Sequence, residues 1–242
     1  TQSRSSAASD VYKRQNIYQM KTLVKFFVLF ITTTCFAQNP IEKTIGEFSE
    51  LKVYDLIEVE LIKGDIDKIV ITGKNAADVL VNNKNGTLKI KMKLEEAFDG
   101  NKTKVKLYYT NLDVIDANEG AYIHSEDIIK QFEVDLNAQE GGKISVKLDT
   151  KYVNIRAVTG ADIIASGLAI HQDISIYTGG DYDGETLITE FTDVSIRLAG
   201  TANVNATKKV TAKVRAGGDI FIYGNPDRID ESRVLGGRVK RM

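Results

Sequence analysis

Apolar and polar residues alternate in short runs along most of the chain, and this period of two predicts β-strands. The alternation is clear in residues 88–92 and 105–108, where apolar residues alternate with lysines. The Asn85-Gly86 pair before the first run predicts a hairpin, because both residues tolerate positive φ. No stretch carries a helical apolar stripe longer than two turns. The pattern predicts an all-β fold with a strand-rich N-terminal part over residues 41–113.

A repeat with a period near twenty residues occupies residues 114–242. A glycine follows each strand-like run, with spacings of 21, 19, 19, 21, 17 and 19 residues, at Gly120, Gly141, Gly160, Gly179, Gly200, Gly217 and Gly236. Such self-similarity is typical of a solenoid. Two short strands and two turns fill one period, which predicts the coil of a parallel β-helix with neighbouring coils about 4.8 Å apart. The alternative, a β-sandwich, favours turns every 8 to 12 residues.

The alternation also predicts which side chains lie inside the solenoid. The apolar members of successive runs should stack in one core, namely Val153, Ile155, Ile174, Ile176, Val194, Ile196 and Val214. The coil at 114–132 is the least regular, because Ile128 and Ile129 interrupt the alternation. A solenoid needs both ends covered. We expect residues 41–113 to cover one end and the basic residues 238–241 to cover the other.

The N-terminus has the organisation of an export signal. Residues 5–15, SSAASDVYKRQ, resemble a translated sequencing adapter, so residues 1–19 are interpreted as an upstream artefact and Met20 as the natural start. Residues 20–37 run from basic through apolar to small side chains, which predicts a signal peptide cleaved after Ala37. Its apolar stretch is shorter than the roughly 20 residues that span a bilayer. The alternative is lipidation at Cys35, but the threonines before it do not match a lipoprotein signal.

Composition narrows the class of protein. Lys and Arg number 32 against 33 Asp and Glu, so no basic excess suggests a nucleic-acid partner. One cysteine excludes a disulfide scaffold and any multi-cysteine metal site. Residues 38–242 contain no cysteine, as suits folding in an oxidising compartment. We therefore expect an exported protein of the periplasm, the outer-membrane surface or the extracellular space, with no transmembrane segment in the mature chain.

Several stretches carry a resemblance to a known family. They are GEFSELKVYDLIEVELIKGD (46–65), NGTLKIKMK (85–93), LYYTNLDVIDANEGAYIHSED (107–127) and AGGDIFIYGNPDRI (216–229), together with the turns TGAD and TGGD. They resemble the family described as putative autotransporter adhesin, head GIN domain, over residues 48–239. The resemblance implies a bacterial envelope protein with a right-handed parallel β-helix, a single domain over residues 38–242. The family's Ser-Gly-Ala-Gly-Asp turns are degraded in the first coils, and no catalytic residue is carried over.

The residues themselves offer little catalytic or metal-binding chemistry. No Ser-His-Asp order, paired-carboxylate motif, phosphate loop or metal motif occurs, so we expect neither an enzyme nor a cofactor. His124 and His171 have no third ligand at a recognisable spacing, which favours packing roles. Asp162, Asp181 and Asp219 follow turn glycines, which favours turn stabilisation by the carboxylate; a calcium site across stacked coils is the alternative.

One outward column of side chains is the candidate ligand face. Aligning the first strand of each repeat places Asn137, Arg156, Tyr177, Arg197 and Arg215 at one outward position. Arginine has a planar fork suited to carboxylate or sulfate groups. Tyr177 between two arginines could make cation–π contacts and stack on a sugar ring. The alternative is a solvated face whose arginines pair with acids such as Glu190 or Asp193.

These observations favour a non-catalytic exported adhesin, or a surface- or carbohydrate-binding module whose partner is a cell-surface glycan or protein. A purely structural envelope protein is the first alternative. A polysaccharide lyase is the second, since many β-helices have that activity, but fold alone does not establish it. A lyase would need a Lys or Arg base beside a calcium cluster.

Overall fold

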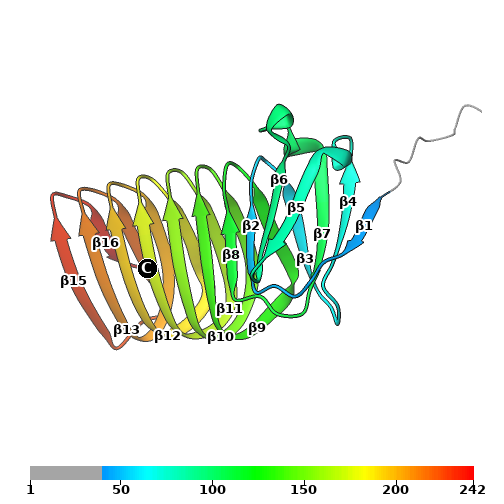
Figure 1. Ribbon diagram of the computed structural model, residues 1–242. Helices are drawn as coiled ribbons and strands as arrows, with labels where there is room; N and C mark the ends of the chain where they lie inside the picture. Colours follow the sequence, from blue (N-terminus) through cyan, green and yellow to red (C-terminus); the bar gives the residue numbers. More distant parts are fainter. Residues whose placement is uncertain (1–39) are drawn as a thin grey trace, which may run out of the picture. The chain divides into compact units, whose positions relative to one another are not determined.

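The computed structural model describes residues 40–242, which form an all-β solenoid (Figure 1). The adapter-like segment, the signal peptide and Cys35 lie outside these residues. Three single-turn 3-10 helices interrupt the strands at Ala76–Asp78, Leu94–Glu96 and Gly100–Lys102. The strands are β1 (Ile41–Thr44), β2 (Glu50–Val53), β3 (Glu58–Lys63), β4 (Lys68–Gly73), β5 (Val79–Lys84), β6 (Thr87–Met92), β7 (Thr103–Tyr109), β8 (Val114–Ala117), β9 (Tyr122–Gln139), β10 (Lys143–Val158), β11 (Asp162–Tyr177), β12 (Asp181–Arg197), β13 (Thr201–Arg215), β14 (Asp219–Tyr223), β15 (Arg228–Val234) and β16 (Arg238–Arg241).

Each central coil is one long strand that bends in its middle, rather than the two short strands that the sequence predicted. Strands β9 to β13 run for 15 to 18 residues and pair in parallel with the coils before and after. Partners in β10 and β11 are 19 residues apart, as in Lys143 and Asp162. The first half of each coil continues the sheet of β3, and the second half continues the sheet of β8. The predicted parallel β-solenoid is therefore confirmed.

The predicted core is confirmed residue by residue. Each of the seven aliphatic residues expected inside is at most 2% exposed. Removing one such side chain from water contributes about 1.5–3 kcal/mol. The alternation of buried and exposed residues along β10 is nearly unbroken from Ile144 to Ala157. The stacked coils thus share one continuous apolar interior.

A buried polar network interrupts this apolar interior and was not expected. Gln172 and Thr192 occupy the inward position that Val153 holds in the coil before. The Tyr182 hydroxyl donates to Oε1 of Gln172 at 3.0 Å, and Nε2 of Gln172 donates to Oγ1 of Thr192 at 2.7 Å. Thr189 donates to the carbonyl of Asn205 at 2.8 Å. Burial raises the pKa of Tyr182, so its hydroxyl stays a donor. These groups satisfy one another, as buried polar groups must.

The predicted glycine turns form in the earlier coils, but the turn after β12 differs from the prediction. Thr159 and Gly160 have φ of 52° and 68°, both in the left-handed region that glycine adopts without strain. In the turn after β12, Ala199 with φ 66° takes the place of that glycine, and Gly200 stands one residue later. A Cβ at Gly200 would overlap the carbonyl oxygen of Gly180 in the coil below. Gly200 is therefore needed for close approach between coils.

The N-terminal part combines hairpins with the beginning of the solenoid. Strands β5 and β6 form the predicted hairpin around Asn85 and Gly86, with φ of 53° and 80°. Strands β1, β4 and β7 also pair antiparallel. Strands β2 and β3, however, stack in parallel on β8 and β9. This part covers the first coil, as expected, and continues its two sheets.

The last coil carries charges that protect its edge. Arg238 pairs with Asp219 at 2.6 Å, and Arg228 pairs with Asp230 at 2.7 Å. Charged side chains on an edge strand oppose pairing with another chain. At the irregular coil, β9 is continuous, with Ile129 buried and Ile128 exposed, and its pairing with β10 shifts register at this point.

Candidate functional site

The predicted ligand face lies on the second half of the coils, but its residues form two columns. Tyr177 aligns with Arg197, and Arg197 aligns with Arg215. Arg156 aligns instead with Ser175 and with Asn137, one outward position away. The prediction of a single five-residue column is therefore wrong. We call Arg156, Tyr177, Arg197 and Arg215 the basic face.

The buried network explains the misalignment. The sequence alignment matched Ile174 with Val153, because both begin an apolar run. In the structure Ile174 aligns with Ile155, and the partner of Val153 is Gln172. Because the inward position at the start of the second half of β11 is the polar Gln172, the apolar run in the sequence begins two residues later, at Ile174. The alignment therefore slipped by two residues, which keeps a side chain on the same face of the strand but moves it to the next column.

The predicted contacts around Tyr177 are confirmed despite this shift. The guanidinium carbon of Arg197 lies 5.5 Å from the ring centroid of Tyr177, and that of Arg156 lies 5.9 Å from it. Both are within cation–π range. Because two guanidinium groups already contact the ring, a sugar could stack on Tyr177 only by displacing one of them. Direct sugar stacking is thus a weaker function for this residue than positioning the two arginines.

The arginines of the basic face have no acidic partner among residues 40–242. Glu190, one of the acids expected to neutralise them, binds Lys208 at 2.6 Å, and Asp193 forms no ion pair within the described chain. By contrast, Arg228, Arg233 and Arg238 of the last coils all pair with carboxylates. The forks of the basic face are therefore available to an anion from outside.

A shallow hollow of about 250 Å³ adjoins the basic face. Arg197 and Arg215 lie on the side nearer the turns, Lys213 lies in the middle beside Ser195, and Asp173 and Asp193 lie on the side nearer the bend. Asp173 and Asp193 are partners on adjacent strands. Burial, and then the like charge of Asp193, raise the pKa of Asp173. Ser175 and Ser195 line the middle, so the hollow can offer hydroxyl groups beside the cations.

The turn aspartates share one column, and two of their three carboxylates pair with cations of a neighbouring coil. Asp162 aligns with Asp181, and Thr201 separates Asp181 from Asp219. Asp162 lies 3.9 Å from Lys143, and Asp219 pairs with Arg238. Within residues 40–242, no three His, Cys, Asp or Glu side chains come together in a way that could hold a metal ion. For Asp162 and Asp219, interstrand ion pairs explain the carboxylate better than turn stabilisation does, whereas Asp181 forms no ion pair within residues 40–242.

Both histidines pack against aromatic rings at the surface, as predicted. His124 stacks on Tyr122 with centroids 4.9 Å apart. His171 stacks between Tyr152 and Phe191, at 5.0 and 4.8 Å. Phe132 extends this row, so four successive coils each contribute one ring at the bend. The sequence analysis missed this aromatic row, although the spacings of its members, 20, 19 and 20 residues, match the period of the solenoid.

Comparison with known proteins agrees with the fold. Residues 47–226 match the model of the family described as "Putative auto-transporter adhesin, head GIN domain". The chain belongs to this family. No curated protein matches it. The predicted resemblance is thereby confirmed.

Several solved structures share this fold. A putative adhesin from Bacteroides fragilis superposes with a TM-score of 0.78 at 19% identity, over 84% of this chain and 96% of that one. A putative adhesin from Parabacteroides merdae gives 0.69 at 17%, over 84% and 95%. A protein from Parabacteroides distasonis described as a putative lipid binding protein gives 0.62 at 16%, over 85% and 97%. At these identities the likeness concerns the fold alone. No helix within residues 40–242 is long and apolar enough to cross a membrane.

Proposed function

We propose that this head GIN domain protein is a non-catalytic, exported binding module whose basic face holds anionic groups of a cell-surface polymer. The observation that carries the proposal is the set of three arginines, on β10, β12 and β13, that have no acidic partner among residues 40–242. Arg197 and Arg215 are partners on adjacent strands about 4.8 Å apart. Arg156 reaches the same Tyr177 ring from the coil before it, so the three guanidinium groups lie along one face. A polymer with repeated carboxylate or sulfate groups can bind several of them at once.

The remaining residues of the hollow support a saccharide as the carrier of these anions. Ser175 and Ser195 lie between the basic and acidic sides, and Lys213 adds a cation. Hydroxyl and carboxylate side chains can bond to sugar hydroxyls, and the arginines can bind the acid groups in a bidentate manner. The family's description as an adhesin fits such recognition at a surface. Export by the N-terminal signal would bring the module to that surface.

Binding of an acidic polysaccharide tests this function. Polygalacturonate would be titrated against the purified protein, with neutral dextran as the comparison polymer. We expect the triple variant Arg156→Ala, Arg197→Ala, Arg215→Ala to lose at least tenfold in affinity. Binding by the parent should also weaken steeply with salt, because exposed charges are screened.

A matched control removes the same charge elsewhere. Lys84, Lys89 and Lys91 lie near the N-terminal hairpin and form no ion pair within the described chain. Replacing these three by Ala changes the net charge as much as the arginine variant does. Equal losses in the two triple variants would show a non-specific charge effect. Failure of the parent to bind polygalacturonate at low salt would refute recognition of carboxylate polymers.

A further inference from the structure

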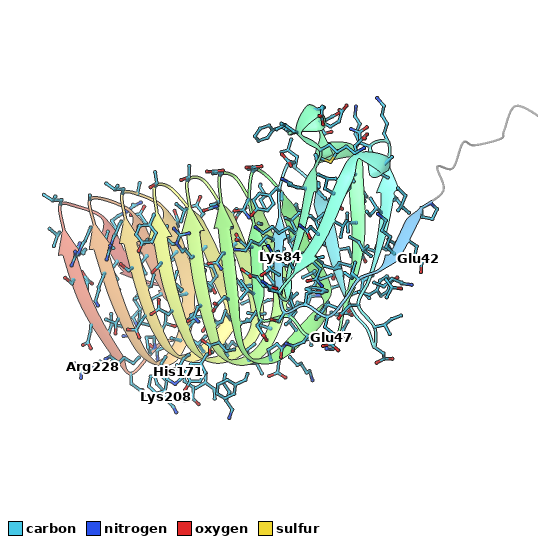
Figure 2. All side chains as sticks on the ribbon, viewed as in Figure 1. Glu42, Glu47, Lys84, His171, Lys208 and Arg228 are labelled. Atoms are coloured by element: carbon cyan, nitrogen blue, oxygen red, sulfur yellow. The ribbon has the colours of Figure 1, made fainter. Side chains whose placement is uncertain are left out.

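A groove follows the bend of the coils, away from the basic face. The chain changes direction there, so outward side chains on either side of the bend diverge and leave a hollow of about 560 Å³. Figure 2 labels His171 and Lys208 along this edge. One wall holds Asp149, Leu168 and Ile188, the other holds Phe132, Lys151, Ile170 and Glu190, and the floor holds Gln131, Thr150, Ala169 and Thr189.

The walls of the groove are unusually apolar for an exposed surface. Phe132 is 60% exposed, Leu168 56%, Ile188 46% and Ile170 37%. Leu168 and Ile188 are partners on adjacent strands, and Ile170 is two residues beyond Leu168 on the facing wall. A contiguous patch of exposed apolar side chains around a concave surface is often a binding site. The volume lies within the range of small-ligand pockets.

One of the cations at the groove, Lys151, has no acidic partner among residues 40–242. Asp149 lies 3.8 Å from Lys130, and Glu190 pairs with Lys208 at 2.6 Å. Lys151 has no acidic partner anywhere in residues 40–242; its ammonium lies 5.3 Å from the ring centroid of Phe132. Lys151 precedes the apolar section, since Leu168, Ile170 and Ile188 belong to the two following coils. The groove therefore presents a cation and then about 10 Å of apolar surface along the axis.

We propose that this groove binds an aliphatic carboxylate, such as a fatty acid or another anionic acyl chain. The carboxylate lies at the ammonium of Lys151, and the hydrocarbon chain lies between Leu168 and Ile188 on one wall and Ile170 on the other. Lys151 is the one cation lining the groove that has no acidic partner among residues 40–242, so the site selects one negative charge on the ligand, and the apolar walls select a hydrocarbon chain. This site shares no residue with the basic face.

Calorimetry with short amphiphiles below their micelle concentration tests the proposal. Decanoate is the probe, and decyltrimethylammonium carries the same chain with the opposite charge. We expect saturable one-to-one binding of decanoate and at least tenfold weaker binding of decyltrimethylammonium. Leu168→Gln with Ile188→Gln should weaken decanoate binding at least tenfold. Lys151→Gln should weaken it severalfold and reduce the discrimination between the two probes.

Matched controls separate the groove from general stickiness. Ile128 is 52% exposed but does not line the groove, so Ile128→Gln should leave decanoate binding unchanged. Lys84→Gln serves the same purpose for Lys151→Gln. If the double variant loses thermal stability, Ile170→Gln on the facing wall gives an independent result and should also weaken binding.

Three results would overturn the proposal. They are no saturable decanoate binding, equal binding of the two probes, or decanoate binding that survives the loss of both Leu168 and Ile188. The Arg156, Arg197, Arg215 triple variant should bind decanoate like the parent. Failure at the groove would therefore leave the proposed polymer binding by the basic face untouched.

Discussion

Several outward lysines of the N-terminal part pair with acids, whereas the arginines of the basic face on the central coils do not. In the N-terminal part, Lys52 of β2 pairs with Glu50 on its own strand at 2.9 Å and with Asp116 of the neighbouring β8 at 3.5 Å. Lys68, Lys104 and Lys106 pair with acids on adjacent strands, whereas Lys84, Lys89 and Lys91 of the hairpin form no ion pair within residues 40–242. In the central coils, Arg156, Arg197 and Arg215 have no such partner in the described chain. Alternation along a strand places cations outside in both regions, so it does not explain why the three arginines of the basic face have no acidic partner in the described chain.

The interiors of the two regions differ as well. The N-terminal part buries large side chains such as Leu88, Met92, Leu107 and Tyr109. The coils bury many alanines, among them Ala157, Ala165 and Ala212, and also the polar network of Gln172. Small inward residues allow the two halves of a coil to lie close together. Such close packing cannot accommodate a larger or charged side chain, so we expect single substitutions in the coils to reduce stability most.

The largest effect is expected from a charge in the coil core. Ile176 is fully buried, so Ile176→Asp would place an unpaired carboxylate in an apolar interior and cost several kcal/mol. That is a large share of the stability of a typical domain. Urea unfolding followed by circular dichroism would measure it. Ser175→Asp, at the neighbouring outward position, should change stability by less than about 0.5 kcal/mol. An Ile176→Asp protein that unfolds like the parent would contradict the stacked core.

An intermediate effect is expected where coils approach closely. Gly200→Ala adds a Cβ that meets the carbonyl oxygen of Gly180, at a φ of 118° that side chains rarely adopt. Gly160→Ala meets nothing within 4 Å and carries only the strain of a positive φ, about 1–2 kcal/mol. We expect Gly200→Ala to lower the free energy of unfolding clearly more than Gly160→Ala does. Equal effects would mean that the backbone adjusts without cost.

The smallest effect concerns the pH dependence of the acidic side of the hollow. The pKa of Asp173 is raised in the folded state by burial and by Asp193. A raised carboxyl pKa means that the folded protein binds the proton more tightly than the unfolded chain. The resulting stabilisation is present at low pH and is lost as the pH rises through the folded-state pKa. Asp173→Asn should therefore be slightly more stable than the parent at pH 7 and equal to it near pH 3. A variant that is less stable at pH 7 would refute this repulsion.

The sequence predicted most of the fold, because a solenoid repeats its signals. The glycine period and the inward aliphatic residues can be recognised from the sequence of each repeat alone. The sequence analysis did not predict the positions where a residue of one coil is determined by its contacts with the next coil. Gln172 and Thr192 look like surface residues, yet their partners Tyr182 and Thr189 satisfy them inside. That adaptation shifted the alignment of Arg156 against Tyr177.

The candidate site was predicted in composition but not in arrangement. Tyr177 does lie between two arginines, although Arg156 reaches it from the neighbouring column. Whether an arginine pairs with an acid depends on the coils above and below it, which a single strand does not show. The bend groove was missed for a related reason. Leu168 and Ile188 are aliphatic residues of the type found in the core, and only the pairing register of the coils shows that they lie outside.

The most direct test of the central claim compares one paired and one free cation in the same assays. Arg197→Gln should lower the affinity for polygalacturonate severalfold and change the free energy of unfolding by less than about 0.5 kcal/mol. Lys52→Gln should leave polymer binding unchanged and destabilise the fold by about 1 kcal/mol, because Asp116 would lose its cation. If both variants instead bind like the parent, or if Arg197→Gln costs stability without affecting binding, the free arginines are not held for a ligand.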